Sequence, residues 1–380
     1  MADQLPYRFQ DIALVRRVSR LGWRPTISWI DDAAPAFGLF LLVLVVPYAF
    51  GLDLINTATL SQLGRYCCLA IMAIGLDLVW GYTGVLSLCQ AMFFTLGGYA
   101  FGMYLAMHGP LDGAGIPRAL FVVSSEVSGM VLPWFWRPFE SFWFSLTMVA
   151  TVPGIVAFVF GYAAFRSRIR GVYFSIITQA ATVAMFLLFC RNDLKLCGTN
   201  GLTNFTTVLG WDLTSPATKL GLYLASVGML VACACFALWL TRSRFGRLLV
   251  AIRDSESRLR FAGYQPVWFK TAVFSLGAVL AGIAGALYTP QTGIITPANM
   301  IASESIWVVV WVAVGGRGTI VGAVLGCLLI KMLESKLTTI MPNGWMYVIG
   351  TAFVLVVLFM PDGLVGQWRK LRSRALGIAL

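Results

Sequence analysis

The sequence predicts an all-α protein that crosses a membrane many times. Hydrophobic residues occupy 59% of the 380 positions, charged residues occupy 12%, and the mean hydropathy is +0.81. About a quarter of the residues in a soluble domain are usually charged. Apolar runs recur along the chain at close to the roughly 20 residues that a helix needs to cross a bilayer. These observations exclude a soluble globular protein.

The first 32 residues are basic and precede the apolar part of the chain. Their arginines stand among apolar residues such as Ile12, a pattern typical of a helix that lies on a membrane surface. No cleavable signal precedes the first apolar run, so the N-terminus is expected to stay cytoplasmic. We therefore expect three parts: a cytoplasmic basic segment at 1–32, a transmembrane domain at 33–366, and a cytoplasmic basic tail at 367–380.

Ten membrane-spanning helices are predicted, some of them short or discontinuous. They lie at about residues 34–52, 66–80, 85–107, 141–165, 172–190, 220–240, 271–288, 299–314, 318–333 and 345–360. The span at 299–314 is the weakest, because its apolar core from Ile306 to Val314 covers only about half of the hydrocarbon thickness at roughly 1.5 Å per residue. Omitting it alone would place the basic tail outside, so we keep it as a short or discontinuous helix.

The basic residues support this topology with both ends inside. Cytoplasmic segments of bacterial membrane proteins carry an excess of Lys and Arg. Most of the 28 basic residues fall on the side that ten spans make cytoplasmic, namely Arg8, Arg16, Arg17, Arg20, Arg24, Arg166, Arg168, Arg170, the seven between Arg242 and Lys270, Arg317, Arg369, Lys370, Arg372 and Arg374. On the outer side, tryptophans at 134, 136 and 143 predict an aromatic anchor at the interface, and the loop at 191–219 is exposed to an outside partner.

The stretch at 241–270 is the only long charged interruption of the transmembrane domain. Glu256 stands four residues before Arg260, and Gly263 can cap a helix end. Apolar residues recur at helical spacing: Phe245, Leu248, Leu249, Ile252 and Leu259. The pattern predicts a short amphipathic helix, which between two spans faces either anionic lipid or a docked soluble partner.

Two glycine motifs suggest a weak internal repeat. Gly81-Tyr-Thr-Gly84 and Gly315-Gly-Arg-Gly318 each follow one span on the cytoplasmic side, and each precedes a helix rich in small residues. Paired glycine-interrupted segments are typical of transporters built from repeats. Chance and ordinary helix packing can produce the same pattern.

Motifs for catalysis and for nucleotide binding are absent from the sequence. The single histidine, His108, excludes haem held by paired histidines and disfavours a metal site built on histidine. No Gly-x-x-x-x-Gly-Lys-Ser/Thr motif is present, so the chain has no P-loop of its own. We assign no catalytic residue, metal ligand or bound cofactor, and an integral-membrane enzyme has no support. The one-sided charge indicates topology, and nucleic acid is not an expected partner.

Polar residues inside the predicted spans are the candidates for a translocation path. They are Asp77, Thr83, Gln90, Gln179 and Glu304. A polar or ionisable side chain at membrane depth is costly unless it faces protein or water, which makes it a functional candidate. The competing interpretation is structural: Gln90 and Gln179 would bond helix to helix, and Asp77 would cap a broken helix.

Several motifs, in order, resemble the permease subunits of branched-chain amino acid and urea ABC importers. They lie at 75–88 (Gly-Leu-Asp-Leu-Val-Trp-Gly-Tyr-Thr-Gly-Val-Leu-Ser-Leu), 97–105, 200–205 (Asn-Gly-Leu-Thr-Asn-Phe), 251–263, 281–288, 311–319 and 361–366. Within that family the sequence looks most like the C-type permease of bacterial urea transporters. Two departures stand out: Ser87-Leu-Cys-Gln90 replaces a common Ser-Leu-Gly-His, and Cys197 replaces a common glycine.

This resemblance implies a multi-pass subunit of an ATP-driven importer in the bacterial cytoplasmic membrane. Its coupling element, which docks on a separate ATPase, would contain Arg253, Asp254, Glu256, Arg258 and Gly263. The implied partners are a homologous second permease, two cytoplasmic ATPase subunits that use ATP, an extracytoplasmic substrate-binding protein, and membrane lipid. A rigid capped helix suits this task, because it can pass closure of the ATPases to the membrane helices.

Urea is the expected substrate, with a branched-chain or other amino acid as the alternative. Because urea is neutral, its path needs hydrogen-bonding groups rather than a counter-ion. A zwitterionic amino acid would favour helix N-termini or a charged side chain. A passive small-solute channel is the more remote alternative, and it would conduct without nucleotide.

Overall fold

The computed structural model describes residues 50, 56–109, 133–169, 171–359 and 363–367. The described chain is helical apart from one short antiparallel hairpin, which confirms the predicted all-α class. The basic segment at 1–32, nearly all of the predicted span at 34–52 and nearly all of the basic tail lie outside the described residues.

The helices follow the predicted apolar runs from residue 66 onward. The elements are α4 (Thr57–Thr83), α5 (Gln90–Met107), η3 (Arg137–Glu140), α7 (Phe142–Arg166), α8 (Val172–Phe189), η4 (Asn192–Leu194), η5 (Gly198–Asn200), β1 (Thr207–Val208), β2 (Trp211–Asp212), α9 (Pro216–Arg242), α10 (Arg244–Phe261), α11 (Pro266–Thr292), η6 (Pro297–Met300), α12 (Ala302–Gly315), α13 (Ile320–Ile340) and α14 (Trp345–Phe359). The run predicted at 85–107 becomes helical only at Gln90, because the chain is non-helical from Gly84 to Cys89.

Five of the described helices are long and apolar enough to cross a membrane singly: α4, α7, α8, α9 and α11. The runs predicted at 299–314 and 318–333 form α12 and α13, which are a sixth candidate only together, and the chain bends by 115° between them. The break falls at Gly315-Gly-Arg-Gly318, where Gly316 and Gly318 adopt positive φ values. The weakest predicted span is therefore one arm of a bent pair, which forms either a broken span or a re-entrant loop.

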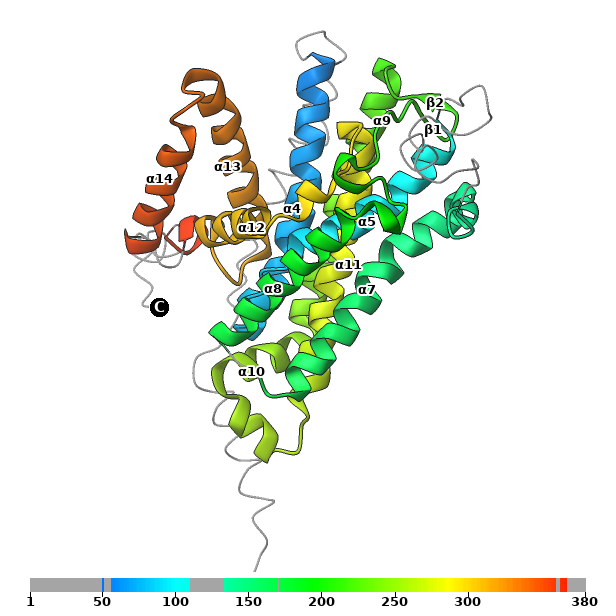
Figure 1. The fold of residues 1–380 in the computed structure, drawn as a ribbon. Coiled ribbons are helices and arrows are strands. Elements are labelled where there is room, and N and C mark those ends of the chain that lie inside the picture. Colours follow the sequence, from blue (N-terminus) through cyan, green and yellow to red (C-terminus); the bar gives the residue numbers. More distant parts are fainter. Residues whose placement is uncertain (1–49, 51–55, 110–132, 170, 360–362, 368–380) are drawn as a thin grey trace, which may run out of the picture.

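Helix α11 runs through the centre of the domain, against α4, α5 and α7 (Figure 1). Close backbone contact holds α11 to its neighbours. A Cβ at Gly97 of α5 would meet the backbone of Gly282, and a Cβ at Gly285 would meet the carbonyl of Phe94. Glycines that let two helices approach in this way are typical of packing inside membranes. The apolar part of α4 is 78% buried, against 28% for α7 and α8, which lie at the periphery.

Candidate functional site

The connection between α4 and α5, from Gly84 to Cys89, is a non-helical stretch. Helix α4 ends at Gly84, whose φ of 74° is left-handed. The Thr83 hydroxyl donates to the carbonyl of Val79 at 2.6 Å and accepts from the Val85 amide at 3.4 Å. The structure thus places Thr83, a predicted path residue, at the end of the helix, where its hydroxyl serves the backbone.

Hydroxyl groups of α8 satisfy the backbone of this non-helical stretch. Ser175 donates to the Leu86 carbonyl at 2.9 Å, the Leu88 amide donates to Thr178 at 3.0 Å, and Thr182 donates to the Leu88 carbonyl at 3.1 Å. Backbone polar groups cannot be left bare in hydrocarbon, and irregular backbone is tolerated only where protein or water satisfies it. Helix α8 therefore stabilises the break.

Gln90 begins α5 immediately after the break. Its side chain is fully buried, and neither its amide oxygen nor its amide nitrogen has a hydrogen-bond partner in the described structure. The next amide, of Ala91, donates to the Ser305 hydroxyl of α12 at 3.2 Å. The amide oxygen of Gln179 likewise has no partner among the described residues. The helix-to-helix bonds expected of a structural glutamine are thus missing at Gln90.

Replacing Gln90 with leucine is expected to lower transport severalfold while leaving insertion intact. A buried polar group without a partner costs about 1–3 kcal/mol, so an apolar residue of similar size leaves folding stability unchanged or higher. Uptake and membrane insertion of the variant check this. Wild-type uptake by Gln90→Leu would reduce Gln90 to a packing residue.

Asp77 ties α4 to the bend between α12 and α13. Its carboxylate accepts a hydrogen bond from the Gly318 amide at 2.7 Å, and the Arg317 guanidinium lies 5.3 Å from the centre of the Trp80 ring. A Cβ at Gly81 would meet both Asp77 and the Gly318 backbone. The two glycine motifs that look alike in the sequence therefore touch each other. Asp77 holds the broken span and lies outside the pocket described next.

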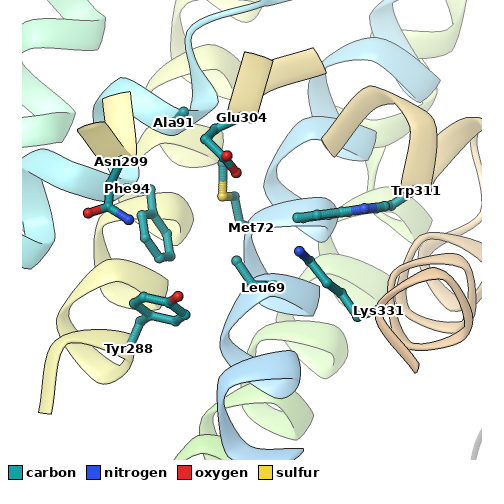
Figure 2. Close-up of a pocket in the computed structure, with 9 residues that line it drawn as sticks. All are labelled: Leu69, Met72, Ala91, Phe94, Tyr288, Asn299, Glu304, Trp311 and Lys331. Carbon is teal, nitrogen blue, oxygen red and sulfur yellow. The ribbon is translucent and has the colours of Figure 1, made fainter. Parts of the chain in front are cut away.

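Six elements line a pocket of about 60 Å³ (Figure 2). Its lining comprises Leu69 and Met72 of α4, Ala91 and Phe94 of α5, Tyr288 of α11, Asn299 of η6, Glu304 and Trp311 of α12, and Lys331 of α13. Of the predicted path residues, the pocket lining includes only Glu304, in the first turn of α12. The pocket combines apolar walls with ionisable groups of both signs.

Three pocket residues were missed by the sequence analysis: Lys331, Asn299 and Tyr288. Lys331 lies near the end of a predicted span, where lysines commonly reach out to the interface. In the structure its ammonium lies 2.8 Å from the Glu334 carboxylate and 5.1 Å from the centre of the Trp311 ring. The signal that could have found it is the pair of charges, Lys331 and Glu334, within one turn of an otherwise apolar helix.

At the opposite end from the β1–β2 hairpin, α10 extends away from the other helices (Figure 1). Its chain turns at Ser255, which has an extended conformation within the helix. Leu249 and Ile252 are buried against the domain, as the apolar spacing predicts. The remaining surface carries exposed basic residues, and this face is the one that the charge distribution makes cytoplasmic.

Two of the predicted coupling residues face the membrane domain. Arg253 donates from Nη1 to the Gly81 carbonyl at the end of α4, at 2.9 Å. Glu256 accepts from Arg260 at 2.6 Å and from Lys270 of α11 at 2.8 Å. Only 9% of the Lys270 side chain is exposed. Arg253 and Glu256 thus anchor α10 to α4 and α11.

The other predicted coupling residues lie on the outer side of α10. Asp254 and Arg258 are exposed, and Phe261 at the end of the helix is 93% exposed. Gly263 follows with a φ of 86° and has no atom near its missing side chain, so it forms the turn toward α11. Arg253 also pairs with Asp254 at 3.3 Å, so the anchoring contacts and the exposed side of α10 meet at this pair.

The outer loop is tied to the segment that leads into α12. Leu202 and Ile295 exchange two backbone hydrogen bonds, of 2.8 and 2.9 Å. Thr296 and Asn299 then form a capping box that begins η6, and Asn299 lines the pocket. On the other side, the buried Trp136 donates to the carbonyl of Lys195 at 3.1 Å, whereas Trp134 and Trp143 are exposed. The outer loop thus connects to one wall of the pocket.

Replacing Gly201 with alanine is expected to detach this loop. Gly201 has a φ of 66°, and a Cβ there would meet the Ile295 carbonyl and Thr296. Gly210→Ala is the matched control, because Gly210 has a φ of 82° and no atom within 4 Å of an added Cβ. Gly201 has a φ of 66° and a ψ of −163°, a region essentially restricted to glycine, so alanine there carries backbone strain of about 1–3 kcal/mol in addition to the clash. Thermal unfolding should show a larger loss for Gly201→Ala, and equal losses would contradict the clash.

Comparison with known proteins identifies the family. The sequence pattern described as "branched-chain amino acid transport system / permease component" matches residues 58–358. The high-affinity branched-chain amino acid transport system permease protein LivM of Salmonella typhimurium is 25% identical over 375 residues, covering 90% of this chain and 79% of that protein. LivM of Escherichia coli K12 is 24% identical and covers 91% and 80%.

A more distant relative is the ribose import permease protein RbsC of Bacillus subtilis, which is 26% identical over 48% of this chain and 58% of its own length. No solved structure matches. The family match covers most of the chain, including both glycine motifs, the pocket and α10. The chain is a multi-pass protein of the bacterial inner membrane and belongs to the family of permease components of branched-chain amino acid transport systems.

Proposed function

We propose that this chain is the permease subunit of an ATP-driven importer for a small amino acid with an apolar side chain. The observation that carries the proposal is the pocket, which brings Glu304 and Lys331 together with the apolar side chains of Leu69, Met72 and Phe94. The relatives named for branched-chain amino acid transport, which align with about nine-tenths of the chain, support the same substrate class.

The charges of the pocket favour an amino acid over urea. Ionisable groups at membrane depth cost free energy and are kept there by function or by pairing. A neutral solute interacts with them only through hydrogen bonds, whereas a zwitterion supplies a charge for each sign. Urea remains the second candidate, because a cavity of about 60 Å³ suits a very small solute and because the motif at 76–80 resembles urea permeases.

Energy for transport comes from partner subunits, because the sequence contains no P-loop. The proposed assembly contains a homologous second permease, two cytoplasmic ATPase subunits and an extracytoplasmic substrate-binding protein. The exposed side of α10, with Asp254 and Arg258, would dock on an ATPase. Movement of α10 would then reach α4 through Arg253 and α11 through Glu256, and α4 forms one wall of the pocket.

Uptake by the assembled transporter in sealed vesicles tests this function. Radiolabelled leucine and urea are offered in parallel, with ATP or with a non-hydrolysable analogue inside. Uptake of leucine that requires ATP hydrolysis is expected. Uptake of urea without leucine would establish the second candidate, and uptake of either solute without hydrolysis would establish a passive channel.

A further inference from the structure

Three side chains from three helices point into the same space in the pocket. Figure 2 shows the carboxylate of Glu304 above, the ammonium of Lys331 to the right and the hydroxyl of Tyr288 to the lower left of Leu69 and Met72. Helices α12, α13 and α11 supply the three polar groups, and α4 supplies the apolar wall. The polar groups therefore surround one end of the cavity, beside an apolar surface.

The two ionisable groups differ in their partners. Lys331 has an ion pair with Glu334, three residues further along α13, at 2.8 Å. Within the described part of the chain, the Glu304 carboxylate forms neither a hydrogen bond nor an ion pair through its own oxygens. Its place in the first turn of α12 favours the negative charge, because a helix N-terminus carries partial positive charge. Glu304 is a carboxylate held at the pocket and available to a cation.

On the basis of the proposed function, these observations indicate which side chain of the pocket binds each charged end of an amino acid. We propose that Glu304 binds the α-ammonium group of the transported amino acid and that Lys331 binds its α-carboxylate in exchange for Glu334. An ammonium group has three donors and adapts to a new acceptor, which suits such an exchange of partners. Glu334 thus occupies Lys331 while the pocket is empty and gives it up when the substrate arrives.

This exchange keeps the charges of the empty pocket partly compensated. Lys331 also lies over the Trp311 ring, so it retains one favourable contact when it changes carboxylates. The apolar side chain of the substrate would lie against Leu69, Met72 and Phe94. Because ligand pockets usually enclose about 300–1,000 Å³, a cavity of about 60 Å³ has to widen to admit an amino acid. Widening would require α12 and α13 to move relative to α4, to which the hydrogen bond between Asp77 and Gly318 ties their bend.

Analogues that lack one end of leucine test this assignment. The ligands are leucine, 4-methylpentanoate, which lacks the ammonium, and 3-methylbutylamine, which lacks the carboxylate. Their inhibition constants against leucine uptake are measured in the assembled transporter for the wild type, Glu304→Gln, Lys331→Met and Glu334→Gln. Lys336→Gln is the matched control, because Lys336 is an exposed lysine on the same helix outside the pocket.

Each variant is expected to affect only the ligands that carry the matching group. Glu304→Gln should weaken the binding of leucine and of 3-methylbutylamine tenfold or more, and the inhibition constant of 4-methylpentanoate should stay unchanged. Lys331→Met should weaken the binding of leucine and of 4-methylpentanoate, and the inhibition constant of 3-methylbutylamine should stay unchanged. Glu334→Gln should strengthen the binding of leucine and of 4-methylpentanoate severalfold, because it removes the carboxylate that competes for Lys331. Lys336→Gln should change none of the constants.

Outcomes that contradict the assignment are separable from failure of the proposed function. If Glu304→Gln weakened the binding of all three ligands equally, Glu304 would have a structural role and the assignment would be overturned. If leucine bound to Glu334→Gln no more tightly than to the wild type, the proposed exchange of partners at Lys331 would be overturned. Insertion and thermal stability, measured for each variant, identify misfolded protein, and Glu304→Asp should then restore part of the ammonium preference. If the wild type imports urea and no amino acid, the proposed function fails before any variant is compared.

Discussion

The double replacement Arg253→Ala with Glu256→Ala is expected to abolish ATP-driven uptake while the protein still inserts into the membrane. Both side chains connect α10 to the membrane domain, through the Gly81 carbonyl and through Lys270. Removing Glu256 also leaves the Lys270 ammonium almost buried without its partner. Breaking such a pair costs about 3–5 kcal/mol. In vesicles, ATP hydrolysis should continue while uptake falls more than tenfold.

A compensating variant distinguishes anchoring from docking. Glu256→Leu combined with Lys270→Met removes both charges and keeps apolar volume, which often preserves stability at a buried ion pair. If Glu256 anchors α10 to α11, this pair should restore part of the uptake that Glu256→Ala loses. If Glu256 instead contacts the ATPase, uptake should stay low. Wild-type uptake by the Arg253 and Glu256 double variant would refute any role in coupling.

Replacing Asp77 with leucine is expected to have the second largest effect, and asparagine at the same position only a small one. The Gly318 amide donates to Asp77 across the contact between α4 and the α12–α13 bend. Leucine leaves that partly buried amide without its acceptor, at a cost of up to about 1–3 kcal/mol, and releases the bend. Asparagine keeps an acceptor oxygen of the same reach. Thermal unfolding and uptake, measured together, should fall for Asp77→Leu alone.

The asparagine variant also decides between the two interpretations of Asp77. A carboxylate that only accepts a hydrogen bond from Gly318 tolerates asparagine, with uptake within about twofold of the wild type. A carboxylate whose charge binds the solute does not, and uptake would then be lost at normal thermal stability. That second result would move Asp77 from a structural role into the translocation path.

Local patterns predicted most of the helices, because the length of an apolar run reports directly on a span. The runs predicted at 141–165 and 172–190 match α7 and α8 almost residue for residue. The non-helical stretch before Gln90 was harder to predict, because its apolar residues continue the pattern of a helix. Its stability comes from hydroxyls of α8, some 90 positions away in the sequence.

The candidate site was less accessible from the sequence. The six elements that form the pocket stretch from Leu69 to Lys331, and no spacing rule joins residues so far apart. The orientation of α10 residues was hidden for a related reason. An arginine in an amphipathic helix is expected to face solvent. Arg253 instead donates to the backbone carbonyl of Gly81, 172 positions earlier in the sequence. The resemblance to urea permeases rested on the residues of a sequence motif at 76–80, which lie outside the pocket and do not determine its charges.

The glycine contacts of α11 limit how the protein can change its access from one side of the membrane to the other. With Gly97 against Gly282 and Gly285 against the Phe94 carbonyl, α5 and α11 touch backbone to backbone. Sliding one helix along the other would drive bulkier residues into that seam. We therefore expect α5 and α11 to move as one rigid unit during the transport cycle.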